Sequence, residues 1–336
     1  MPCFVRSGAE SLRSKEQTLR PAAGEHGRPL SMKLIKAGLL KLLSFMGRTL
    51  RPTIIGRSKW LTKAHTALTL WIHGSNQVDT GPFHVRFDPR DRVIGKKLAL
   101  YGSYEKDEIR LLCSLVKPGD VVMDIGANFG LHSLYLSRAV GPNGKVLAFE
   151  PDPDNFALLC ANLEANGCAN VLPFQYALGE KSGDVELFQT ENNRGNLSLA
   201  DLCRTGRSVT VPMRRADEVL RGLRLRADLA KIDVEGAEPL VMSGLGEYKP
   251  ERILFEFVPE FIRYFNDDGE RFLNSFIAAG YTLELVDSSH PVRAQVRPFE
   301  ILARTSQFPF CCNIIAVRQN PLTERIDAKF ASAPAP

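Results

Sequence analysis

The stretch "VVMDIGANFG", residues 121–130, decides the fold. An apolar strand carries Asp124 near its tip and runs into Gly126 and Gly130, with Asn128 between the two glycines. A strand that only fills a core needs no acid at its tip, and a turn that only reverses the chain needs no helix behind it. Glycine adopts dihedrals closed to other residues and lets a ligand or a helix approach the backbone closely. The segment therefore predicts a ligand site at the end of a strand.

Strands and helices alternate around this stretch. Further apolar strands are expected at residues 145–150, 171–176, 229–234, 251–257, 281–287 and 311–319. Helical patterns separate most of them, and this rhythm is typical of an α/β protein with a doubly wound, mostly parallel sheet covered on both faces. The last two strands leave no room for a long crossover helix, so we expect them to pair antiparallel.

The charge of the chain is unevenly distributed. Residues 1–60 contain 12 Lys and Arg against 3 Asp and Glu, whereas the remainder contains 31 against 35. A slightly acidic body behind a basic leader does not indicate a nucleic-acid binder. The seven cysteines are an odd number and form no CxxC pair, which favours a reducing, cytoplasmic compartment over a disulfide framework.

Composition divides the chain into four segments. They are a polar leader that we expect to be disordered (1–31), a helical N-terminal extension (32–80), the main domain (81–320) and a loose Ala/Pro-rich tail (321–336). Met32 is a second candidate for the start of the protein, because the first patterned segment begins there.

The segment "MKLIKAGLLKLLSFMGRTLRP" begins the extension. Its apolar residues recur at helical spacing, and its lysines fall mostly elsewhere on the helix. Residues 32–50 are therefore expected to form either a membrane-surface helix or a helix packed on the main domain or on a partner.

The glycine turn does not match the common nucleotide fingerprints. A dinucleotide site needs the G-x-G-x-x-G spacing, and a P-loop needs GK followed by Ser or Thr. Instead, Asp124 precedes Gly126 by two residues, and a second acid, Glu150, ends the next strand. An acid at that strand end is placed to accept both hydroxyls of a ribose, and Asp124 suits a cationic group. The two acids together fit S-adenosylmethionine, whose nucleoside and amino acid ends need these partners.

Five blocks of the sequence resemble the FkbM family of S-adenosylmethionine-dependent methyltransferases. In order they are "MDIGANFG", "VLAFEPDPDNFALLCANLEANG", "QYALGEKSGDVELF", "KIDVEGAEPLVMSGL" and "ILFEF", within about residues 100–317. The resemblance implies a seven-stranded, Rossmann-like class I methyltransferase sheet. It also implies O-methylation of a hydroxyl on a small-molecule or glycan acceptor, such as a sugar or a secondary metabolite.

The resemblance also implies which residues bind the cofactor. The methionine end would be surrounded by Asp124, Gly126, Asn128 and Gly130. Glu150 would hold the ribose with Pro151 beside it, and Tyr176 and Ala177 would lie near the adenine.

Methyl transfer is an in-line displacement, so alignment supplies much of the acceleration, and a general base helps a hydroxyl nucleophile. Asp233, at the end of the fourth strand, is the first candidate base, with a cofactor or backbone contact as its alternative role. Glu256 in the fifth strand is the second, and His132 is a weaker candidate expected to turn into its helix. Glu235 and Glu238 are alternatively expected to cap the next helix. Asp233 alone is no basis for a metal site, so no metal is expected.

Two other functions are considered. The fold can hold S-adenosylmethionine without transferring its methyl group, as a non-catalytic binding module. An NAD-dependent oxidoreductase on a Rossmann-type sheet is the other possibility, and the glycine spacing is evidence against it.

Overall fold

The computed structural model describes residues 30–50, 59–188, 197–202, 206–265, 267–286, 293–304 and 311–318. Residues 1–29 of the expected leader and the whole expected tail lie outside the described residues. The first helix begins at Leu30, two residues before the predicted start of the extension.

The described chain forms helices and strands in the order that the sequence predicts, with some additions. The helices are α1 (Leu30–Leu50), α2 (Lys59–His73), α3 (Ile94–Tyr101), α4 (Lys106–Ser114), α5 (Leu131–Val140), α6 (Pro153–Ala165), α7 (Ala216–Leu223), α8 (Glu238–Gly244), α9 (Pro259–Ile262), α10 (Gly269–Ala278) and α11 (Pro298–Arg304), with a 3₁₀ turn, η2 (Arg263–Phe265). The strands are β1 (Gln77–Asp79), β2 (His84–Arg86), β3 (Val121–Ile125), β4 (Lys145–Phe149), β5 (Val171–Phe174), β6 (Ala177–Leu178), β7 (Gly183–Phe188), β8 (Ser208–Arg214), β9 (Leu229–Ile232), β10 (Arg252–Phe257), β11 (Tyr281–Val286), β12 (Arg293–Val296) and β13 (Cys312–Arg318).

An eight-stranded sheet forms the centre of the molecule, in the order β12-β11-β13-β10-β9-β3-β4-β5. The five strands from β10 to β5 are parallel, and β13 lies antiparallel to both β10 and β11. The seven predicted strands are all present, and β12 adds an eighth at the edge. The doubly wound fold is therefore confirmed. Strand order reverses between β3 and β9, where ligands of such sheets collect at the carboxyl ends.

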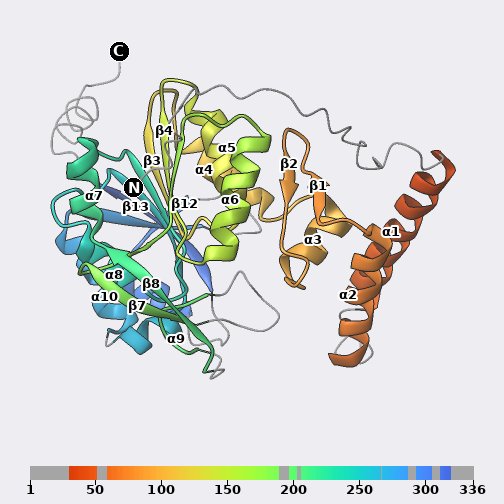
Figure 1. Cartoon of the computed structure of the whole chain (residues 1–336). Helices are drawn as coiled ribbons and strands as arrows, with labels where there is room; N and C mark the ends of the chain where they lie inside the picture. Colours follow the sequence, from red (N-terminus) through yellow and green to blue (C-terminus); the bar gives the residue numbers. More distant parts are fainter. Residues whose placement is uncertain are drawn as a thin grey trace, which may run out of the picture.

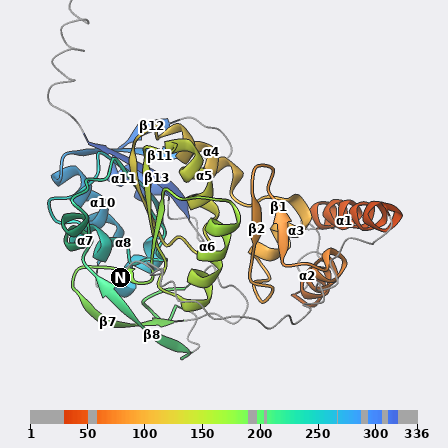
Figure 2. The same ribbon diagram turned by 45° about the horizontal axis from the view of Figure 1, so that its top comes forward.

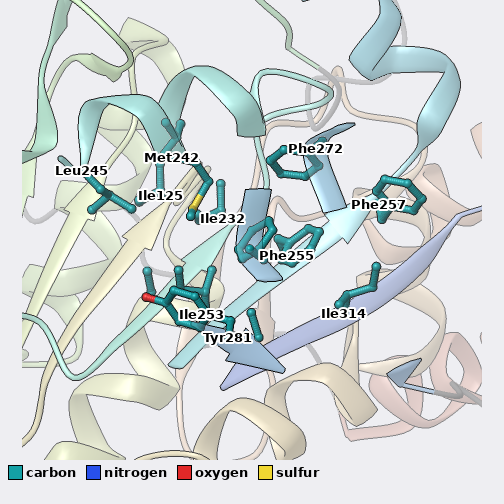
Figure 3. Packing of buried hydrophobic residues seen from close by; sticks show 14 of the residues in the cluster. Ile125, Ile232, Met242, Leu245, Ile253, Phe255, Phe257, Phe272, Tyr281 and Ile314 are labelled. Atoms are coloured by element: carbon teal, nitrogen blue, oxygen red, sulfur yellow. The ribbon is translucent and has the colours of Figure 1, made fainter. Parts of the chain in front are cut away.

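Helices cover both faces of the sheet, which is why its strands read as apolar throughout (Figure 1). The side chain of Val122 in β3 packs toward α4, α5 and α6, whereas its neighbour Met123 packs toward α7, α8 and α10. On this second face Phe255 of β10 stacks on Phe276 at 4.7 Å. It also meets Phe272 edge-on (Figure 3). The aromatic rings therefore pack α10 against β10 in the middle of the sheet.

The three strands between residues 177 and 214 form a second sheet, in the order β6-β8-β7. The expected third strand of the main sheet ends at Phe174 rather than at Tyr176. The chain therefore leaves the main sheet just before Tyr176, which then lies in the connection to β6.

The N-terminal extension forms an antiparallel pair of long helices, α1 and α2, that lies beyond α3 and the small β1–β2 sheet in both views (Figures 1 and 2). The short helix α3 is an addition to the predicted elements. None of the helices in the described part of the chain is long and apolar enough to cross a membrane. The five cysteines that the structure describes are free thiols, as expected.

Candidate active site

Two cavities adjoin at the switch point of the sheet. Gly126, Asn128 and Asp233 line both of them, so these residues form a shared wall. Phe149 and Glu150 at the end of β4 line the first cavity. The second cavity lies toward the start of α4 and the end of β10. A ligand in the first cavity therefore touches the same wall as a ligand in the second.

The first cavity contains six of the eight residues expected to bind the cofactor. They are Gly126, Asn128, Glu150, Pro151, Tyr176 and Ala177. The Glu150 carboxylate is buried and accepts hydrogen bonds from the backbone N–H groups of Asn128 (2.8 Å) and Asp152 (2.9 Å). Burial raises the pKa of Glu150 to about 8, although these two hydrogen bonds oppose the shift. The two bonds fix the position of the carboxylate while each oxygen keeps a free lone pair.

Gly126 is required by a close backbone approach. Its φ is +79°, and an added Cβ would lie 1.9 Å from the carbonyl oxygen of Asp233. Its N–H donates to the carbonyl of Phe149, and the Asp233 N–H donates to Ile125, each at 3.0 Å. The turn is therefore fixed between the ends of β4 and β9.

Gly130, expected at the methionine end of the cofactor, packs against a neighbouring helix in the structure. It lines neither cavity within the described structure, and an added Cβ would lie 2.5 Å from Cδ1 of Leu159 in α6. Gly130 therefore lets α5 begin close against α6.

Asp124 also lies elsewhere than expected. Its side chain is fully buried, accepts a hydrogen bond from the Ser133 hydroxyl at 2.6 Å and lies 3.7 Å from Nζ of Lys231. It is absent from the described walls of both cavities. Asp124 was expected to face a cationic group of the ligand, but in the structure its cationic partner is Lys231. A lysine inside an apolar strand was the sequence signal for this pair, because a buried ammonium needs a carboxylate.

The ammonium of Lys231 contacts two residues of the shared wall. Its ammonium lies 3.0 Å from Oδ2 of Asp233 and donates to the carbonyl of Gly126 at 3.4 Å. Burial lowers the pKa of Lys231, but the surrounding carboxylates raise it more, so that it lies above its usual value. The side chain therefore stays charged and orients Asp233.

The second cavity is strongly acidic. It brings together both predicted bases, Asp233 and Glu256, and adds Glu235, and these three carboxylates approach one another within 4.8 Å. Burial raises the pKa of Glu256 to about 7 and that of Glu235 to about 10, and the neighbouring Asp233 adds to both shifts. Glu238, the first residue of α8, does not cap the helix as expected; its carboxylate instead accepts from the N–H groups of Val234 and Gly236 in the preceding loop.

Two candidate functional residues, Glu105 and Glu108, have no counterpart among the residues predicted from the sequence. Glu105 lies just before α4, Glu108 lies in its first turn, and both belong to a group with His132 of α5 whose ligand atoms lie within 4.8 Å. His132 is buried as expected, yet it lines the second cavity. Acids in a first helical turn are also explained by the helix dipole, so their pattern gave no separate signal.

A comparison with family models matches residues 124–283 to the methyltransferase FkbM domain, which confirms the family resemblance. The chain is 32% identical over 142 residues to the hexuronic acid methyltransferase AglP of Haloferax volcanii, covering 42% of this chain and 56% of that protein. It is 30% identical over 168 residues to the 31-O-demethyl-FK506 methyltransferase FkbM of Streptomyces tacrolimicus, covering 41% and 64%. The chain thus spans about three fifths of the length of these relatives.

Solved structures give weaker matches. A SAM-dependent O-methyltransferase from Thermotoga maritima superposes with a TM-score of 0.39 at 14% identity, over 67% of this chain and 71% of that one. A SAM-dependent methyltransferase from Aquifex aeolicus gives a TM-score of 0.37 at 14% identity, over 63% and 90%.

Replacing Gly126 with alanine tests the close approach at the shared wall. Gly119 is the matched control, because it has a φ of +95° and open space around its Cβ position. We expect Gly119→Ala to cost about 1–2 kcal/mol for the left-handed backbone. We expect Gly126→Ala to cost roughly 3 kcal/mol or more, because the carbonyl of Asp233 must also move. Denaturant unfolding of both variants measures the difference, and equal losses would contradict the tight turn.

Proposed function

Residues 124–283 form a methyltransferase FkbM domain, and from this premise we propose that the chain is an S-adenosylmethionine-dependent O-methyltransferase. The observation that carries the proposal is a pair of cavities with a common wall. The first contains Glu150, an acid placed to bind a ribose, and the second is lined by several acidic side chains. The acceptor class is the hydroxyl of a sugar, a glycan or a secondary metabolite. The names of the hexuronic acid and 31-O-demethyl-FK506 methyltransferases support this class.

The first cavity fits the nucleoside part of the cofactor. Glu150 offers free lone pairs at the end of β4, where a ribose diol donates two hydrogen bonds. The ring of Tyr176 lies 5.8 Å from that of Phe149 and lines the cavity with Ala177, which gives an apolar place for an adenine. Gly126 and Asn128 would hold the methionine end at the shared wall. When bound, S-adenosylmethionine supplies an activated methyl group.

The second cavity fits the acceptor, and its contacts distinguish the two candidate bases. One oxygen of Asp233 is paired with the Lys231 ammonium, whereas one oxygen of Glu256 accepts a hydrogen bond from the neutral Cys311 thiol. Glu256 has a pKa raised to about 7, close to the working pH of a general base. We therefore assign the base role to Glu256, the second choice of the motif analysis, and the orientation of the acceptor to Asp233.

The alternative of a non-catalytic binding module remains distinguishable from this proposal. A module that only holds the cofactor has no need of clustered, half-buried acids beyond the shared wall. The cost of placing Glu235 and Glu256 next to Asp233 at this partial burial favours an enzyme.

Cofactor binding tests the assignment of the first cavity. Calorimetric titration of the purified chain should give micromolar binding of S-adenosylmethionine and little binding of NAD. Glu150→Ala should weaken S-adenosylmethionine binding at least about tenfold, because the ribose diol loses its hydrogen-bond acceptor. Glu164→Ala, an exposed acid on α6, is the control and should bind normally. Tight NAD binding, or an unaffected Glu150 variant, would overturn the assignment.

The pH dependence of methyl transfer tests Glu256. A base must be ionised, and a pKa of about 7 means that the active carboxylate form accumulates as the pH rises. The rate should therefore increase up to about pH 7 and then level off. Glu256→Gln should lose about 10²–10⁴-fold in rate together with this ascending limb.

Asp233→Asn is the companion variant and should be slower while keeping the limb. Radiolabelled methyl transfer to a panel of uronic acids, neutral sugars and hydroxylated polyketides provides the assay. A limb that survives in Glu256→Gln and disappears in Asp233→Asn would return the base role to Asp233.

We further infer that the N-terminal helix pair binds an anionic membrane surface from a cytoplasmic position. Leu43 of α1 is buried, but Leu34, Leu42 and Phe45 on another face of the helix are 67%, 54% and 62% exposed. Trp71 of α2 is 79% exposed. Residues 30–50 and 59–73 contain six Lys and Arg and no Asp or Glu. Exposed apolar side chains with cationic neighbours are typical of helices that lie on anionic lipid.

Vesicle cosedimentation tests this inference. The protein should bind phosphatidylserine-containing vesicles, less so at high salt, and Phe45→Ser with Trp71→Ser should reduce binding strongly. Ile277→Ser on α10 removes an apolar residue that is 45% exposed on the main domain, and it should have no effect. Unchanged partitioning of the double variant would leave the helix pair as a packing element or a protein contact.

A further inference from the structure

Beside the second cavity, α4 and α5 bring together a histidine and two glutamates. Glu105 and Glu108 are three residues apart at the start of α4, and His132 is the second residue of α5. Nε2 of His132 lies 3.4 Å from Oε1 of Glu108 and 3.7 Å from Oε2 of Glu105. All three side chains are largely withdrawn from solvent, with exposures of 8%, 17% and 33% for His132, Glu108 and Glu105.

Nε2 of His132 has no hydrogen-bond partner among the residues that the structure describes. The whole residue is only 7% exposed, so water does not substitute freely for a partner. An unpaired polar atom at this depth is costly and indicates a ligand or an ion. The atom points at two carboxylates, so the missing partner is a cation.

We propose that His132, Glu108 and Glu105 bind a divalent transition-metal ion. Bonds of about 2.0–2.2 Å in a tetrahedral arrangement place the ligand atoms roughly 3.4 Å apart. The observed separations of 3.4 and 3.7 Å from Nε2 match this spacing and are too long for good hydrogen bonds. The sequence does not predict this site, because the three residues form no recognisable metal-binding motif.

The local charge agrees with a bound cation. Lys231 is the only lysine or arginine among the described residues of the cavity wall, and its ammonium is paired with Asp124 and Asp233. The carboxylates of Glu105 and Glu108 thus lack a cationic partner of their own in the described structure.

The donor set indicates the kind of ion. One imidazole nitrogen with two carboxylates suits Mn²⁺, Fe²⁺, Co²⁺ or Zn²⁺, whereas Ca²⁺ and Mg²⁺ prefer oxygen ligands alone. The amide of Asn313 donates to the second oxygen of Glu108 at 2.9 Å, as a partner that orients a metal ligand does. Glu105 and His132 line the second cavity, so the open coordination positions face the space assigned to the acceptor. The metal site stands independently of the methyl-transfer proposal.

The neighbouring trio of Asp233, Glu235 and Glu256 is a weaker candidate for the same ion. Its members are all acids, and the Lys231 ammonium already binds Asp233 at 3.0 Å. No atom of this trio is buried and unpartnered within the described structure. The histidine-containing group is therefore the one to which we assign the ion.

Metal titration of the full chain tests the proposal. Protein dialysed against a chelator is titrated with MnCl₂ and CoCl₂ in the absence of S-adenosylmethionine, and the Co²⁺ absorption spectrum reports nitrogen and oxygen coordination. We expect one ion per chain, and at least about tenfold weaker binding in both His132→Gln and Glu108→Gln. Thermal melting of each variant confirms that it is folded, and the isosteric Glu108→Gln covers the case in which the histidine variant is unstable.

Asp233→Asn and Glu260→Gln, acids of the same cavity wall outside the group, serve as controls and should bind the ion normally. Binding that is lost in Asp233→Asn but kept in His132→Gln would move the ion to the acidic trio and overturn the proposal. Weak, non-stoichiometric binding that is equal in all variants would mean an adventitious ion only and would also overturn it. The metal titration contains no S-adenosylmethionine, so neither result bears on the methyltransferase assignment. That assignment is tested separately by the titration with S-adenosylmethionine.

Discussion

The site depends on the buried ion pairs of the Lys231 ammonium with Asp124 and Asp233. Lys231 is 2% exposed and lies between Asp124 of β3 and Asp233 after β9, two neighbouring strands at the switch point. Removing one partner of a buried pair leaves an uncompensated charge, so each of the three groups fixes the others. The same ammonium contacts the carbonyl of Gly126, which in turn determines how close the glycine turn lies to Asp233. The contacts of the Lys231 ammonium thus hold Gly126 and Asp233, two residues of the wall that the cavities share.

The short sequence motifs predict the positions of residues that depend only on neighbouring elements of the chain. The end of β4 placed Glu150, and the glycine turn placed Gly126, because both follow from a strand, a turn and a helix that are adjacent in sequence. Asp124 was assigned to the ligand because the sequence does not say which face of β3 it occupies relative to Lys231. The metal-type group joins the starts of two different helices, and Asn313 reaches it from the far end of the chain. Such contacts are set by tertiary packing, which no spacing pattern records.

Backbone strain at the second cavity is another feature that the sequence does not predict. Four non-glycine residues have a positive φ in the described chain, and three of them, Glu105, Asn128 and Glu235, line the second cavity. Asparagine tolerates this conformation, but glutamate adopts it at a cost, and such cost is typically retained at functional sites. Two carboxylates of the acidic cavity are therefore held by strained backbone that the surrounding fold must stabilise. Neither position looks unusual as a residue type, so the sequence alone gives no sign of it.

The arrangement of charge relates the two cavities to the direction of the proposed reaction. S-adenosylmethionine held at the first cavity would carry positive charge on its sulfonium, and methyl transfer would move that charge toward the acceptor oxygen. Glu256 lines the second cavity and not the first, and its pKa of about 7 leaves it partly ionised at neutral pH, so its field favours charge that has moved. A group that interacts more strongly with the transition state than with the bound reactants lowers the barrier. The paired Asp233 at the shared wall contributes to both states, and Glu256 beyond it supplies the difference.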